Sequence, residues 1–84
     1  MTSQKFYAYV LQSIEHKKFY TGHTQDLEKR LMEHNSGKTS SKKKYAPWKL
    51  IYFEEFETRV EAVAREKYFK SGIGREFLKS IKTN

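Results

Sequence analysis

An arginine and a histidine lie four residues apart in the first half of this 84-residue chain, directly after a segment rich in tyrosine. Arg30 and His34 share this spacing with the apolar pair Leu27 and Leu31. Residues four apart lie on one face of a helix, so the two pairs would form adjacent polar and apolar edges. A guanidinium and an imidazole held beside a tyrosine-rich strand indicate a site for an anion.

The composition also favours an anionic partner. The chain has 17 Lys and Arg against 10 Asp and Glu, a formal charge of +7. In so small a domain this favours nucleic acid, with an acidic membrane surface or an acidic protein as alternatives. No cysteine is present, which excludes disulfides, thiolate nucleophiles and cysteine-based metal sites. No apolar run approaches the ~20 residues of a membrane span, and no signal-peptide pattern precedes the first strand, so we expect a cytoplasmic protein.

Apolar periodicity and turn residues predict six elements in the order β-β-α-β-α-α. Their approximate bounds are 6–11, 18–21 and 48–56 for the strands and 25–35, 59–70 and 74–81 for the helices. This order predicts an α+β class: a single domain over residues 1–84 with a three-stranded antiparallel sheet packed against three helices. The third strand carries apolar residues on both faces, which favours a central position in the sheet.

The second helix has a clear sequence signal at its beginning. Thr58 and Glu61 have the spacing of a capping box. The buried face that the sequence predicts for this helix consists of Val60, Val63, Ala64 and Tyr68.

Residues 38–47 form the only strongly biased segment, with four lysines and no apolar period. Long connections of this kind are often functional, and lysines suit contacts to phosphates. The predicted DNA-binding residues are Lys38, Lys42, Lys43, Lys44 and Tyr45. The alternative is an ordinary solvated loop.

Two tyrosine motifs and three later polar residues resemble the GIY-YIG endonuclease domain, and especially its small stand-alone bacterial members. The motifs are Tyr7-Ala8-Tyr9 and Tyr20-Thr21-Gly22, and Arg30, His34 and Glu66 follow them in order. Alanine replaces the isoleucine of the first motif and tyrosine its glycine, while threonine replaces the isoleucine of the second. The resemblance covers nearly the whole chain.

The resemblance implies an endonuclease that hydrolyses DNA phosphodiester bonds with one divalent metal ion, Mg²⁺ or Mn²⁺. Its catalytic residues would be Tyr9, Tyr20, Arg30 and His34, its metal ligand Glu66, and its structural motif residues Tyr7 and Gly22. One carboxylate suffices because Mg²⁺ commonly keeps several waters. The arginine would pair with the scissile phosphate through its planar fork. Either tyrosine or the histidine would act as general base, and the sequence leaves all three open.

Every candidate also has a structural explanation. The two tyrosines suit half-buried strand positions, and His34 suits the dipole at a helix end. Arg30 has Glu33 and Asp26 nearby as ion-pair partners, and Glu66 has Lys70 at i+4. The joint occurrence of these residues favours the functional interpretation.

Three functions therefore compete. The first is a structure-selective endonuclease acting on DNA in repair or recombination, with no membrane association. The second is a non-catalytic nucleic-acid-binding module with the same fold. The third is an accessory subunit that needs a homodimer or a larger repair protein as partner. His16 and His23 lack metal-ligand spacing, and we expect both in loops.

Overall fold

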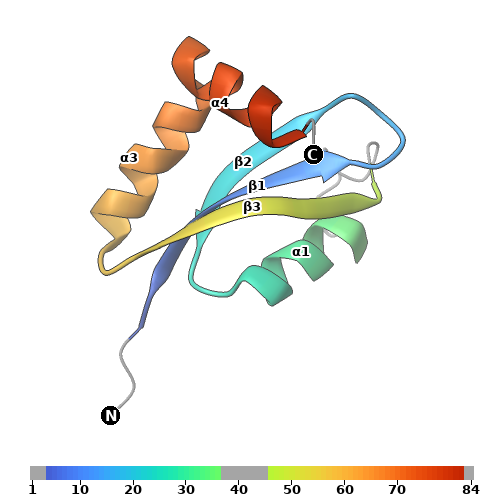
Figure 1. Cartoon of the computed structure of the whole chain (residues 1–84). Helices are drawn as coiled ribbons and strands as arrows, with labels where there is room; N and C mark the ends of the chain where they lie inside the picture. Colours follow the sequence, from blue (N-terminus) through green and yellow to red (C-terminus); the bar gives the residue numbers. More distant parts are fainter. Residues whose placement is uncertain (1–3, 37–45, 83–84) are drawn as a thin grey trace.

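The structure is a computed structural model that describes residues 4–36 and 46–82. Its strands are β1 (Phe6–Ser13), β2 (Phe19–Thr24) and β3 (Trp48–Phe56), and its helices are α1 (Leu27–Ser36), α3 (Arg59–Lys70) and α4 (Gly72–Lys82) (Figure 1). The order of the elements and the α+β class are confirmed. No helix among these residues is long and apolar enough to cross a membrane.

The sheet is antiparallel, and its strand order is β2-β1-β3. The prediction that 48–56 is the central strand is wrong, because β1 pairs with both neighbours and β3 lies at an edge. Its apolar residues are explained by helices on both sides of the sheet: α1 covers one face, and α3 and α4 cover the other (Figure 1). An edge strand that is covered on both faces has the same apolar sequence pattern as a central strand.

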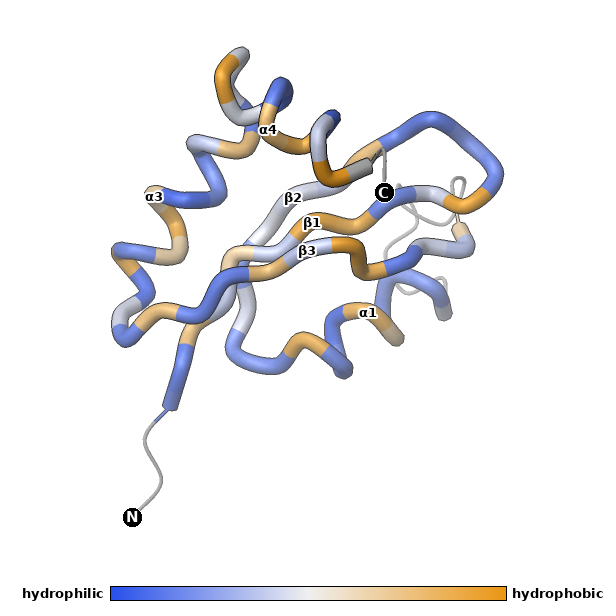
Figure 2. Tube along the Cα trace, in the orientation of Figure 1, coloured by the Kyte–Doolittle hydropathy of each residue, from blue (hydrophilic) through white to orange (hydrophobic). Residues whose placement is uncertain are grey.

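The core has two halves, because successive residues of β1 face opposite sides of the sheet. Ala8 and Val10 pack with Phe69 and Leu78 under α3 and α4. On the other face the buried residues are Tyr9, Leu11 and Trp48, packed under α1. Figure 2 shows the hydrophobic residues along the middle of β1 and β3, and hydrophilic residues in the turn between β1 and β2.

The capping box at the beginning of α3 is confirmed, since the Thr58 hydroxyl accepts from the Glu61 amide and the Glu61 carboxylate accepts from the Thr58 amide. The predicted buried face of this helix is wrong in part. Ala62 and Phe69 are its buried residues, whereas Val60 is 78% exposed. Arg65 fills the inner face between them, because its guanidinium stacks over Phe69 and donates to a β3 carboxylate.

Candidate active site

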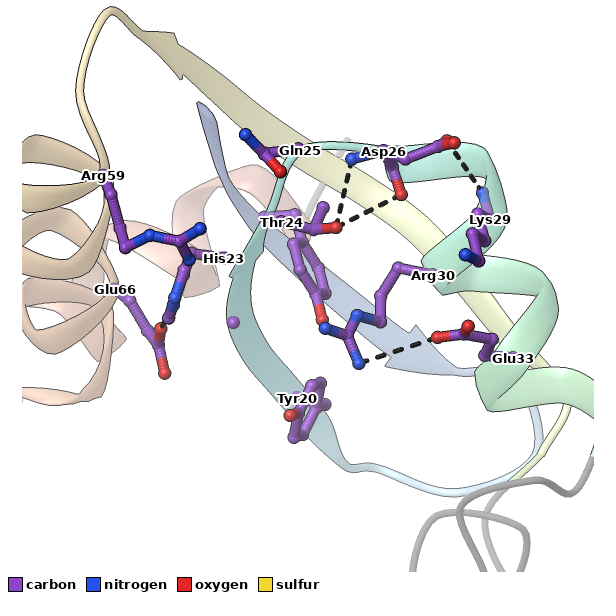
Figure 3. Close-up of a pocket in the computed structure, with 12 residues that line it drawn as sticks. Tyr20, His23, Thr24, Gln25, Asp26, Lys29, Arg30, Glu33, Arg59 and Glu66 are labelled. Carbon is purple, nitrogen blue, oxygen red and sulfur yellow. Dashed lines mark hydrogen bonds and ion pairs between the residues drawn. The ribbon is translucent and has the colours of Figure 1, made fainter. Parts of the chain in front are cut away.

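A pocket of about 450 Å³ lies along β2, with α1 on one side and α3 on the other (Figure 3). The predicted site residues that line it are Tyr9, Tyr20, Gly22, Arg30 and Glu66. The remaining lining residues are His23, Thr24, Gln25, Asp26, Lys29, Glu33 and Arg59. Residues from four elements, separated by up to 57 positions in the sequence, therefore meet in one place.

Tyr9 reaches the pocket because the residue opposite it on β2 has no side chain. Tyr9 and Gly22 are partners in the register of β1 and β2. A Cβ on Gly22 would lie 2.7 Å from the Tyr9 hydroxyl oxygen and 2.9 Å from Cζ of the same ring. Tyr9 is only 2% exposed, yet it contributes to the pocket wall.

The alternation of β2 brings both faces of the sheet to the pocket. Tyr20 packs with the core under α1, together with Leu27 and Leu31. His23 belongs to the opposite face and reaches Glu66 of α3. In Figure 3, Glu66 and Arg59 extend from α3, and Arg30 extends from α1 on the other side of the strand. Because β2 is an edge strand, the pocket can extend around it.

Glu66 is held by two basic side chains. Nδ1 of His23 donates to Oε1 at 2.6 Å, and Nζ of Lys70 donates to Oε2 at 2.8 Å. Burial alone would raise the pKa of this carboxyl, but the hydrogen bonds from Lys70 and His23 outweigh it and lower the pKa below 4.5. Glu66 is therefore an ionised carboxylate beside the pocket, and the ion pair with Lys70 that the sequence offered as an alternative is present.

Among the described residues, Arg30 has one weak ion pair. Its Nη1 lies 3.6 Å from Oε1 of Glu33, and its side chain is 43% exposed. Exposed pairs at such distances contribute little to stability. The Asp26 carboxylate instead accepts from the backbone amide of Lys29 at 3.1 Å, so it caps α1. The guanidinium keeps most of its donors for a ligand in the pocket.

His34 lies behind the pocket wall and does not line it. It lies in the last turn of α1, as the helix-end interpretation expected, and it is buried, with an exposed fraction of 2%. Its Nε2 is 3.4 Å from the Tyr9 hydroxyl oxygen, and its ring centroid is 4.7 Å from that of Tyr20. Trp48 also belongs to this aromatic cluster, and its ring centroid lies 6.5 Å from that of His34. His34 therefore contacts both tyrosines on the side away from the pocket.

Burial raises the pKa of Tyr9 well above its ordinary value of 10.0. Its interaction with Tyr20 raises this pKa further, and the positive charge of Arg30 opposes the shift without cancelling it. Tyr9 therefore keeps its proton at neutral pH. Tyr7 lies two residues earlier on β1 and packs edge-to-face on Phe53 outside the pocket, with ring centroids 5.9 Å apart.

Sequence reasoning missed part of this site. His23 lies in β2 and not in a loop, which corrects the earlier expectation, whereas His16 lies in the exposed turn as expected. The sequence does contain a signal for it: successive residues of a strand point to opposite faces of the sheet, so a strand over 19–24 places the His23 side chain on the face opposite that of Tyr20. Arg59 is the first residue of α3, immediately after the capping threonine. The predicted DNA-binding residues Lys38, Lys42, Lys43, Lys44 and Tyr45 lie outside the described residues.

The side chains of the pocket suit a metal ion that is bound by a single carboxylate. Within 4–36 and 46–82 no three His, Asp or Glu residues cluster as metal ligands do. Each oxygen of Glu66 accepts one hydrogen bond and keeps a second lone pair. A single carboxylate of this kind fits a hard cation that retains most of its waters, such as Mg²⁺.

The fold is a small α+β domain, in which a tyrosine pair, an arginine and a glutamate share one pocket. Residues 5–76 match the family model described as the GIY-YIG catalytic domain. The chain therefore belongs to the GIY-YIG family, whose nucleases act on DNA.

Relatives define its place within the family. The chain is 44% identical over 71 residues to a UPF0213 protein of Streptococcus pyogenes serotype M3, covering 83% of this chain and 76% of the relative. A UPF0213 protein from serotype M5 (strain Manfredo) matches with the same identity and coverage. Among solved structures, the solution structure of UPF0213 protein BH0048 from Bacillus halodurans is similar, with 32% identity and a TM-score of 0.54 over 93% of this chain and 85% of that one.

Proposed function

We propose that this protein is a divalent-metal-dependent endonuclease that hydrolyses DNA phosphodiester bonds and selects its substrate by DNA structure. The observation that carries the proposal is the meeting of Tyr9, Tyr20, Arg30 and Glu66 around one pocket. An activated water, a cation for the phosphate and a site for a metal ion are the parts that this hydrolysis needs. The helices α1, α3 and α4 of the described residues all pack on the sheet, so we expect backbone and shape contacts to select the substrate.

Proton removal from the attacking water is assigned to the tyrosines and His34 as a unit. Tyr20 lines the pocket. In this proposal its hydroxyl accepts the proton of the water, while its own proton passes to the Tyr9 hydroxyl. Tyr9 stays protonated because of its raised pKa, so it relays a proton and does not hold a charge. Its hydroxyl lies 3.4 Å from Nε2 of His34, which receives the proton at the end of the relay.

Arg30 binds the phosphate. A planar guanidinium donates two parallel hydrogen bonds to phosphate oxygens. Its existing ion pair with Glu33 is long and half-exposed, so a phosphate replaces it at small cost. The charge that develops on the phosphate oxygens is thereby stabilised without rebuilding the site.

Glu66 is the residue that would hold Mg²⁺ or Mn²⁺, together with waters and phosphate oxygens. When bound, the metal ion would supply charge stabilisation at the phosphate and to the leaving oxygen. Lys70 and His23 keep the carboxylate ionised and fix its orientation. These two residues therefore have a positioning role.

The same ion pairs favour a second candidate function. Because both oxygens of Glu66 are already bound to basic side chains, the carboxylate also makes sense as a purely structural group. The chain would then be a nucleic-acid-binding module on a nuclease fold. Cleavage separates the two functions, since the module binds DNA and leaves it intact.

The test uses branched and plain duplex DNA of the same sequence, each labelled on one strand, with Mg²⁺, Mn²⁺ or EDTA. The endonuclease proposal expects nicks with metal, none with EDTA, and a preference for the branched substrate. Binding to either substrate without nicks under both metals would favour the binding module. A homodimer or a repair-protein partner remains a separate proposal, tested by the mass of the protein across concentrations.

A further inference from the structure

A second hollow lies between the turn that joins β1 to β2, the beginning of β2, and the α3–α4 junction. Its volume is about 620 Å³. Phe69 and Leu78 form its floor and are 1% and 3% exposed, so the floor belongs to the packed core. Phe19 forms part of the wall and is 36% exposed, which leaves its ring accessible.

Basic side chains from three segments surround this hollow, which we call the basic groove. They are Lys17, Lys18, Lys70, Arg75 and Lys79. None of the described residues that line the groove is acidic. Outside the lining, Glu76 lies 3.8 Å from Lys79, but both side chains are more than 70% exposed and the pair is weak.

The charge of the groove contrasts with that of the candidate active site. The pocket is lined by three cations and three carboxylates, so its formal charges cancel with neutral histidine. These residues are Lys29, Arg30 and Arg59, against Asp26, Glu33 and Glu66. A balanced pocket gives orientation but little long-range attraction for a polyanion. Lys70 is paired with Glu66, so the other four positive charges of the groove supply that attraction in the part of the chain that the structure describes.

The groove and the pocket are adjacent. Tyr20 lines both hollows. Lys70 lines the groove, and its Nζ binds Oε2 of Glu66, which lines the pocket. A strand with one phosphate at Arg30 would therefore continue past Tyr20 into the groove.

We propose that the basic groove binds the single DNA strand that flanks the scissile phosphate, with phosphates on Lys17, Arg75 and Lys79 and a base stacked on Phe19. A positive groove with an accessible aromatic ring is the usual arrangement for single-stranded nucleic acid. The basic side chains hold the backbone, while the ring takes the base without reading its identity. This inference rests on the proposed function, because it places the strand relative to the pocket.

The test compares two double variants that lose the same charge. Arg75→Gln with Lys79→Gln removes two cations of the groove. Lys49→Gln with Lys67→Gln removes two exposed cations that line neither hollow. Binding of a labelled 12-nucleotide single strand is measured in EDTA between 50 and 300 mM salt, a range over which phosphate contacts dominate the affinity (about 12 nucleotides covers one site of this kind). Circular dichroism checks that all variants are folded.

The groove variant is expected to bind at least about tenfold more weakly at low salt, and its slope of log affinity against log salt should fall by about 1.4 for two lost phosphate contacts. The control should keep the slope of the wild type. Wild-type affinity and slope in the groove variant would overturn the proposal. Equal losses in the groove variant and the control would also overturn it, because the effect would then belong to net charge and not to the groove.

Phe19→Ala separates a nucleic acid strand from a simple phosphate ligand. It should weaken binding of the single strand about fivefold or more and leave binding of inorganic polyphosphate unchanged. Equal effects on both ligands, or none on the strand, would reduce the groove to an anion site. Tighter binding of an equally long duplex through the same cations would replace the single-strand assignment.

Cleavage is measured separately, so the two proposals fail separately. If the wild type cuts DNA but the groove variants bind like the control, the groove assignment fails and the nuclease stands. If the groove variants lose binding but the wild type cuts nothing with either metal, the groove stands and catalysis fails.

Discussion

The hydroxyl of Tyr9 occupies the space that a side chain on Gly22 would need. The two residues are register partners, and a Cβ on Gly22 would lie 2.7 Å from the hydroxyl oxygen. Tyr9 is 2% exposed and packed against Tyr20 and His34, so its ring cannot shift without disturbing that packing. The glycine of the second tyrosine motif therefore makes room for the tyrosine of the first.

Gly22→Ala is expected to destabilise the fold by about 1–3 kcal/mol, because the methyl group forces the Tyr9 ring to shift within a packed core. Urea unfolding measures the change. Gly72→Ala is the matched control, since a Cβ there meets nothing within 4 Å and should leave stability equal or slightly higher. Equal stability of Gly22→Ala and wild type would show that the Tyr9 hydroxyl is not held against Gly22.

Tyr20→Phe and Tyr9→Phe each remove one hydroxyl without leaving a large cavity. If both hydroxyls carry the proton from water to His34, each variant should lose about 10²–10⁴ in cleavage rate. The cleavage rate is measured as a function of pH. The part of its pH dependence that comes from the proton relay should disappear in both variants. Full activity of Tyr9→Phe with loss in Tyr20→Phe would remove Tyr9 and His34 from the relay.

Arg30→Lys keeps the positive charge but loses the planar fork that pairs with phosphate. We expect cleavage to fall by about 10²–10³ and the free energy of unfolding to change by less than about 0.5 kcal/mol, because the ion pair of Arg30 with Glu33 is long and exposed. Single-turnover rates with saturating protein separate this loss from weaker binding. Glu33→Gln is the control, and it should retain activity. Wild-type rates in Arg30→Lys would mean that only charge is needed.

Glu66 should make stability depend on pH. Its pKa in the folded protein lies below the ordinary 4.5, so its pairs with Lys70 and His23 stabilise the fold above about pH 4.5. That contribution is lost as the pH falls through the lowered pKa. Glu66→Gln should therefore be less stable than wild type at pH 6, and the difference should shrink toward pH 2.5 in urea unfolding. Glu55→Gln, on the exposed edge of β3, should show a small difference that varies little. A constant difference for Glu66→Gln would contradict the pairing.

Local sequence patterns were sufficient to predict the helices and strands, but not to predict which elements lie next to each other in the fold. The capping box at Thr58 and the order of the six elements follow from local patterns, and both were predicted correctly. The edge position of β3 was not, because coverage by helices on both faces gives the same apolar pattern as a central position. Val60 was misplaced for a related reason: Arg65 takes an inner position on α3 by stacking on aromatic rings, so hydrophobicity alone misreads that face.

The site shows the same division. The tyrosines, Arg30 and Glu66 were selected by the resemblance to the GIY-YIG domain, and the structure brings them to one pocket. The hydrogen bond between His23 and Glu66 joins residues 43 positions apart, which no local pattern indicates. The burial of His34 beneath both tyrosines likewise depends on how α1 packs on the sheet.

The most direct test of the central claim is cleavage and binding of one branched DNA substrate by wild type, Glu66→Gln and Glu55→Gln, with Mg²⁺. We predict that all three bind with similar affinity, that wild type and Glu55→Gln cut, and that Glu66→Gln does not. Cleavage by Glu66→Gln at the wild-type rate would contradict the assignment of the metal ligand, and binding without cleavage by the wild type would contradict the enzyme itself.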